Sequence, residues 1–112
     1  MIEYGTVNPF YQSEKWKRKR RYVLARDGHT DQIEKRYGRM KTAQTVHHIF
    51  PLEKFPEYAW NSWNLISVSY ATHNKLHNRN RDTLTREGLD LLRRTAKKRN
   101  IIVTKEMIDM LV

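Results

Sequence analysis

Three short segments in the middle of the chain decide its fold: residues 46–52 read VHHIFPL, residues 64–68 read NLISV, and residues 72–79 read THNKLHNR. The first begins with a β-type run, Val46–Phe50, which ends at a proline. The second predicts a strand over Leu65–Val68, an antiparallel partner for the first. The third lies in a predicted helix, Ala71–Arg79. The three segments therefore predict a β-hairpin followed by a helix.

Four of the five histidines lie in these segments. Because side chains alternate along a strand, His47 and His48 point to opposite faces, and a site that used both would need a bend there. His73 and His77 are four residues apart and would share one face of a helix, where two imidazole nitrogens can converge about 2.0–2.1 Å from a divalent metal. With His47 alongside, three metal ligands would be present. The alternative interpretation is a solvated pair of histidines in a basic protein.

The composition indicates a folded, basic domain. The chain has 112 residues, 22 Lys and Arg against 12 Asp and Glu, a formal net charge of +10, and 11% aromatic residues. This length and composition predict one domain over residues 1–112, and the charge favours a polyanion, most often nucleic acid, as partner. The absence of cysteine excludes disulfides, thiolate zinc sites and a cysteine nucleophile. Short apolar runs and no signal-peptide pattern favour a cytoplasmic protein without a membrane span.

Helices are expected on both sides of the hairpin. A basic helix over about 13–26 begins with Ser13 as its cap, and six of the seven residues in Lys15–Arg21 are basic. A second helix is predicted over about 85–99, and Thr104 would cap a short last helix. Residues 29–44 show no clear periodicity. The expected fold class is therefore α+β, in a small and mainly helical domain.

The three segments, together with YQSEKW at 11–16 and VLARDGH at 23–29, resemble the HNH endonuclease family. The likeness is greatest to the small HNH nucleases of bacteriophages and prophages, which are often encoded beside packaging genes. It covers about residues 10–80. The resemblance implies a ββα-metal (His-Me) finger over about 44–80.

The resemblance also implies roles for individual residues. His47 takes the position of the first metal ligand, which is Asp in many members, and His73 takes that of the final ligand; His77 matches a further ligand in the colicin-type nucleases. His48 takes the position of the general base. Asn64 takes that of the central Asn, which holds the hairpin loop and orients the base, although an ordinary turn residue is the alternative. The implied cofactor is one divalent metal ion: Mg, Mn, Ni or Zn.

Basic residues near the finger and in the first helix are expected to contact DNA phosphates. The best candidate beside the site is Arg79, for which a solvated charge is the alternative. The predicted contacts in the basic helix, whose alternative is a solvated helix face, are Lys17, Arg18, Arg20 and Arg21.

The chain departs from many relatives at one feature. These relatives carry two Cys-x-x-Cys pairs around the finger that bind a structural zinc ion. Aligned here, the four positions hold Asp31, Glu34, Ser69 and Thr72. We therefore expect no structural zinc, two solvated acids, and aromatic packing in its place, by Tyr37, Tyr58, Trp60, Trp63 and Tyr70.

The sequence thus favours a metal-dependent HNH endonuclease that hydrolyses DNA phosphodiester bonds. A catalytically silent, basic DNA-binding or phage packaging accessory module, with terminase proteins as partners, is the main alternative. An RNA- or ribosome-binding protein is a third hypothesis. The sequence leaves open the metal, the oligomeric state and the choice between nicking and cutting.

Overall fold

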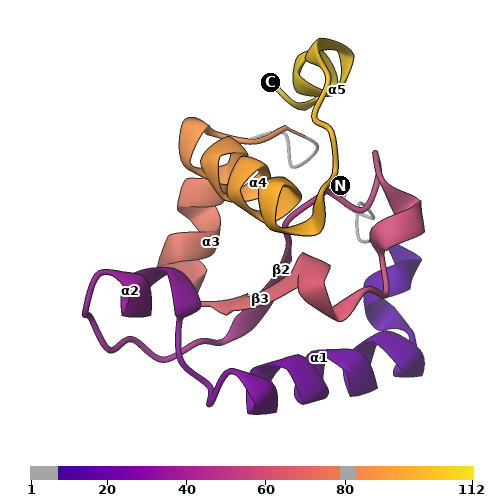
Figure 1. The fold of residues 1–112 in the computed structure, drawn as a ribbon. Helices are drawn as coiled ribbons and strands as arrows, with labels where there is room; N and C mark the ends of the chain where they lie inside the picture. Colours follow the sequence, from indigo (N-terminus) through magenta and orange to yellow (C-terminus); the bar gives the residue numbers. More distant parts are fainter. Residues whose placement is uncertain (1–7, 79–82) are drawn as a thin grey trace.

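The computed structural model describes residues 8–78 and 83–112, and has an α+β fold in which helices flank a two-stranded sheet (Figure 1). This confirms the predicted fold class. In chain order the described elements are the 3-10 turn η1 (Pro9–Gln12), α1 (Glu14–Arg26), α2 (Gln32–Arg36), β2 (Thr45–His48), the 3-10 turns η2 (Pro56–Tyr58) and η3 (Ser62–Asn64), β3 (Leu65–Val68), α3 (Tyr70–Leu76), α4 (Arg86–Arg99) and α5 (Lys105–Leu111). None of the described helices is long and apolar enough to cross a membrane.

The hairpin separates two apolar clusters. β2 and β3 are antiparallel, with Thr45 opposite Val68 and His48 opposite Leu65. On one face of the sheet, α1 packs its buried side chains against the strands; this cluster contains Trp16, Val23, Leu24, Ala43, Val46 and Leu65. α3 and α4 cover the other face (Figure 1), where the larger cluster includes Phe50, Val68, Leu76 and Leu92. β3 therefore contributes side chains to both clusters, whereas β2 contributes Val46 to the smaller one.

The helices begin where the sequence supplies a capping side chain. The hydroxyls of Ser13, Thr85 and Thr104 accept hydrogen bonds from backbone N–H groups in the first turns of α1, α4 and α5. α4 ends at Asn100, in the left-handed region with φ 58°. These three helices were predicted. The short helix α2 was not, because Asp31 caps a segment too short to show periodicity.

The helix after the hairpin is shorter than predicted. α3 begins at Tyr70 and ends at Leu76. His77 has an extended backbone and forms an isolated antiparallel bridge with Leu84, which ends the helix. The prediction that His73 and His77 share a helix face is therefore wrong, because only His73 lies in the helix.

The four positions that align with the relatives' cysteines, Asp31, Glu34, Ser69 and Thr72, form one hydrogen-bonded group, here called the Asp31 cluster. The Asp31 carboxylate is fully buried; one oxygen accepts the N–H groups of Ile33 and Glu34 at 2.9 Å, and the other accepts the N–H of Ser69 at 2.9 Å. Thr72 donates its own N–H to the Ser69 hydroxyl. Burial alone would raise the pKa of Asp31, but these bonds and one from the Thr72 hydroxyl outweigh burial and lower the pKa.

The expected aromatic packing is confirmed for three of its five residues and wrong for the other two. Tyr37 and Tyr70 are exposed. Tyr58 and Trp63 pack against the larger apolar cluster, and Trp60 packs against the smaller one. The expectation that both acids are solvated fails for Asp31, whose buried carboxylate joins the two segments instead.

Candidate metal centre and general base

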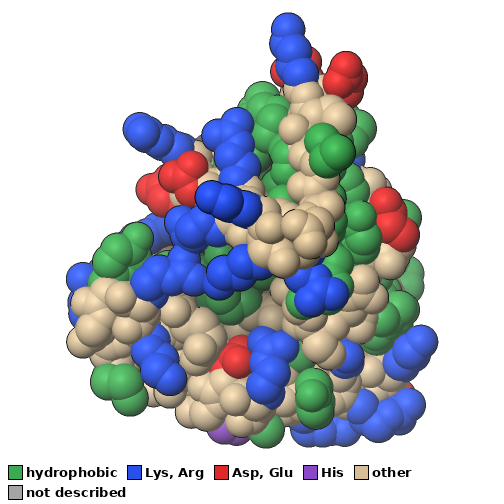
Figure 2. All heavy atoms as spheres, in the orientation of Figure 1, with side chains coloured by type: hydrophobic (Ala, Val, Ile, Leu, Met, Phe, Trp, Pro, Cys, Tyr) green, Lys and Arg blue, Asp and Glu red, His purple; other side chains and the backbone are tan. Residues whose placement is uncertain are grey.

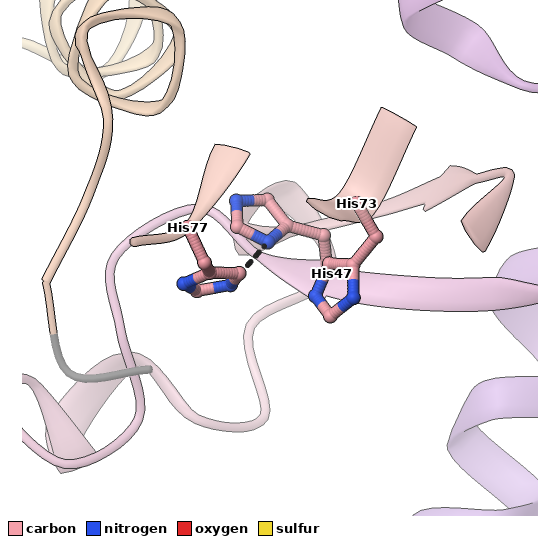
Figure 3. Close-up of side chains that lie close together, drawn as sticks. All are labelled: His47, His73 and His77. Atoms are coloured by element: carbon pink, nitrogen blue, oxygen red, sulfur yellow. Dashed lines mark hydrogen bonds between the residues drawn. The ribbon is translucent and has the colours of Figure 1, made fainter. Parts of the chain in front are cut away.

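Three imidazoles meet between β2 and α3. His47 projects from β2, His73 from α3 and His77 from the extended residue after it, and the rings point toward one another (Figure 3). The ring centroids of His47 and His77 are 4.8 Å apart, and those of His47 and His73 are 5.3 Å apart. One nitrogen from each ring lies within 4.8 Å of the others. Nitrogens around a tetrahedral metal are about 3.3–3.4 Å apart, so modest side-chain rotation would close the set.

The donor set fits a divalent metal ion. His47 is fully buried, and its Nε2 has no hydrogen-bond partner among the described residues. Its Nδ1 lies 3.1 Å from Nε2 of His77. Burial lowers the pKa of His47 well below its ordinary value, and the neighbouring His77 and His73 lower it further, so the ring is neutral at pH 7. Neutral imidazole is the form that binds metal, and the triad could therefore hold one divalent ion.

His48 lies on the opposite face of β2. Its ring stacks on Trp16, with centroids 5.1 Å apart, and only 5% of the residue is exposed. Nε2 lies 3.1 Å from the Ala59 carbonyl oxygen, and Nδ1 lies 3.3 Å from the Tyr11 hydroxyl. Since a carbonyl oxygen only accepts, Nε2 carries the proton and Nδ1 keeps the lone pair. Burial lowers the pKa of His48, against the opposing effects of the Ala59 carbonyl and the Glu53 charge, so the ring is a neutral base at pH 7.

Asn64 holds the loop that positions His48. Its side chain is fully buried, accepts the N–H of Phe50 at 2.7 Å, and donates to the carbonyls of Phe50 and Tyr58 at 3.2 Å. Tyr58 directly precedes Ala59, whose carbonyl orients His48. Asn64 thus fixes the hairpin loop through backbone contacts, and His48 takes its orientation from that loop.

The structure brings together only some of the predicted site residues. His47, His73 and His77 form one group, whereas His48 does not enter it. The bend that a joint site for His47 and His48 would need is not present, because β2 is a regular strand through both residues. Arg79 lies outside the described residues.

The basic helix α1 uses some of its charges within the protein. Arg20 donates to the Gln44 carbonyl at 2.5 Å, and Lys17 pairs with Glu14 at 3.4 Å. Arg18 and Arg21 are exposed. Figure 2 shows Lys and Arg side chains gathered over α4 and along α1, with few acids between them. The surface over both helices is therefore positively charged.

Sequence reasoning missed Tyr11 as a member of the site. No role was assigned to this residue from the sequence, yet its hydroxyl lies 3.3 Å from Nδ1 of His48. The two residues are 37 positions apart, and no local pattern marks a contact over that separation. The signal that could have found it is its place in the segment 11–16, which carries part of the family resemblance.

A comparison with solved structures finds an HNH endonuclease of the deep-sea thermophilic bacteriophage GVE2, in a crystal structure with a manganese ion. The two chains share 28% sequence identity and a TM-score of 0.57, over 81% of this chain and 79% of the phage chain. No family model matches the chain, and no curated protein sequence matches it. The chain has an HNH-type fold, as the resemblance of its sequence segments implied.

Proposed function

We propose that this protein is a metal-dependent endonuclease that hydrolyses phosphodiester bonds of DNA. The observation that carries the proposal is the convergence of His47, His73 and His77 in a chain with an HNH-type fold. The similar phage protein is an HNH endonuclease whose structure holds manganese. Three imidazoles accept Mn, Ni or Zn more readily than Mg.

In this proposal His48 is the general base. Its neutral ring offers Nδ1 to a water molecule, takes a proton from it, and so prepares the oxygen that attacks phosphorus. Asn64 acts through the loop, by keeping the Ala59 carbonyl on Nε2. When bound at the triad, the metal ion would supply positive charge for the scissile phosphate and the leaving oxygen.

The opposite faces of β2 suit this division of roles. In an in-line displacement the attacking and leaving oxygens lie on opposite sides of phosphorus. β2 is paired on one edge only, by β3, so a phosphate at its other edge would have the base on one side and the metal ligands on the other. The positive surface over α1, including Arg18 and Arg21, would bind neighbouring phosphates and make affinity fall steeply with salt.

Supercoiled plasmid incubated with the protein and Mg²⁺, Mn²⁺, Ni²⁺ or Zn²⁺ tests the proposal. We expect conversion to nicked or linear DNA with at least one metal, and none with EDTA. His73→Ala should remove both metal binding, measured by calorimetry, and cleavage. His48→Ala should lower cleavage by about 100-fold or more while metal binding persists.

A matched control replaces a histidine outside the site. His29 is exposed and has a positive φ of 54°, so His29→Asn removes an imidazole at a position where asparagine is tolerated. This variant should cleave like the wild type. Intact plasmid under every metal would reject the nuclease function, and full cleavage by His48→Ala would reject only the assignment of the base.

The second candidate function is a catalytically silent DNA-binding or packaging module. One observation favours it: the lone pair of His48, which a base must offer to water, is occupied by the Tyr11 hydroxyl. Gel shifts with DNA in the absence of any cleavage would support this function. Terminase proteins remain its proposed partners.

A further inference from the structure

His48 is enclosed on nearly every side. Trp16 covers one ring face, and the ring of Phe10 approaches with its centroid 5.7 Å away. Nε2–H donates its hydrogen bond to the Ala59 carbonyl. Only Nδ1 remains for an incoming water molecule, and there the Tyr11 hydroxyl lies 3.3 Å away.

Water and the Tyr11 phenol compete for one position. A neutral imidazole with its proton on Nε2 has a single lone pair, in the ring plane at Nδ1, and it accepts one strong hydrogen bond. Burial raises the pKa of Tyr11 to about 12, with a further contribution from the charge of Glu53, so the phenol keeps its proton and donates it to Nδ1. The hydroxyl therefore stands where an attacking water would have to bind.

Tyr11 is held in a way that allows it to leave. It lies in η1, a 3-10 turn of four residues, and 37% of the residue is exposed. Phe10, its neighbour, packs against the smaller apolar cluster, whereas Tyr11 meets Phe10 and Trp16 only by edge contacts. Rotation of the Tyr11 side chain toward solvent would leave the packing of η1 in place.

We propose that Tyr11 is a positioning residue of this site: its phenol occupies the lone pair of His48 in the free protein and yields that position to the attacking water when a scissile phosphate binds. This rests on the nuclease function proposed above. Between turnovers the phenol keeps the His48 ring in the tautomer that a base requires. The Tyr11 hydroxyl also gives the buried Nδ1 of His48 a hydrogen-bond partner when no substrate is bound.

Tyr11→Phe tests whether the phenol competes with water for Nδ1 of His48, because this variant lacks the hydroxyl and keeps the ring. The single-turnover rate constant for nicking supercoiled plasmid should rise about two- to tenfold, the effect of removing one competing neutral hydrogen bond. A merely structural role would lower this rate. An unchanged or lower rate in a variant that melts like the wild type would overturn the proposal. Tyr37→Phe, at an exposed tyrosine far along the chain, is the matched control and should leave the rate unchanged.

A second measurement does not depend on cleavage. Diethyl pyrocarbonate acylates the lone pair of neutral imidazole, and tandem mass spectrometry identifies the modified histidine. Tyr11→Ala should make His48 react several-fold faster while exposed His29 reacts as in the wild type. Equal reactivity of His48 in both proteins would show that the phenol does not hold Nδ1. If the wild type cleaves no DNA, the nuclease function fails, and the acylation result still reports the contact on which the inference stands.

Discussion

Replacing Asp31 by asparagine tests whether one buried carboxylate stabilises this fold, as a structural zinc ion does in the HNH nucleases that carry two Cys-x-x-Cys pairs. Asn retains the shape but turns one acceptor oxygen into an N–H donor. With its oxygen on the α2 side, it can still accept from Ile33 and Glu34. The N–H of Ser69 would then face another donor, whereas the Thr72 hydroxyl can rotate and accept.

The expected loss of stability follows from these contacts. A hydrogen bond to a charged group contributes about 1.5–3 kcal/mol, and the two remaining bonds to Asn are weaker without the charge. We expect Asp31→Asn to lower the free energy of unfolding by about 3 kcal/mol, a large part of the roughly 5–15 kcal/mol typical of a domain. Urea denaturation followed by tryptophan fluorescence measures the difference, since Trp16, Trp60 and Trp63 lie in or against the two apolar clusters.

The control and the pH dependence make the test specific. Asp90 is exposed on α4, so Asp90→Asn should change the stability by less than about 0.5 kcal/mol. Because folding lowers the pKa of Asp31, its carboxylate stabilises the protein above the unfolded pKa of about 3.9, and this contribution is lost as the pH falls through the folded pKa. The gap between wild type and Asp31→Asn should therefore narrow below about pH 4. Equal stability of the two proteins at pH 7 would refute the role of the Asp31 cluster.

Three further predictions concern packing, pH and metal. An added Cβ at Gly88 would lie 2.2 Å from the backbone oxygen of Leu76, so Gly88→Ala should push α3 and α4 apart and cost about 1–3 kcal/mol, seen as a lower melting temperature. Because the pKa of His48 is lowered, the single-turnover cleavage rate should stay level near pH 7 and fall only below about pH 6.5. Metal binding measured over the same pH range distinguishes protonation of His48 from dissociation of the metal ion. Cysteines at all four positions of the Asp31 cluster should create a second metal site, and cobalt binding with thiolate absorption bands would demonstrate it, whereas binding at the triad alone would contradict it. The four substitutions are Asp31→Cys, Glu34→Cys, Ser69→Cys and Thr72→Cys.

The sequence predicted the elements whose signals are local. Ser13, Thr85 and Thr104 are capping residues, and each precedes a helix that the structure contains. The alternation of side chains along a strand also predicted that His47 and His48 point to opposite faces. These features depend on neighbours within a few residues, and they can be read from the chain alone.

What the sequence could not predict depends on contacts between distant segments. The end of α3 is set by the bridge between His77 and Leu84. The spacing of His73 and His77 therefore predicted correctly that the two rings lie close together, although they do not share a helix face. The burial of Asp31 depends on Ser69, 38 positions away. Tyr11 likewise reaches His48 only through the tertiary fold. Polar residues whose hydrogen-bond partners are distant in the sequence show no periodic pattern from which the contact could be predicted.

The division of β2 between two faces also limits how this sequence can vary in length. A single residue inserted or deleted between Thr45 and His47 would exchange the two faces, sending His47 toward Trp16 and His48 toward α3. Substitutions in the strand leave that arrangement intact, and exposed residues 53–54 in the loop leave room for a change of length. Among homologues that keep His47 and His48, we therefore expect gaps in the loop and none in the strand, a pattern set by the two-residue repeat of the strand.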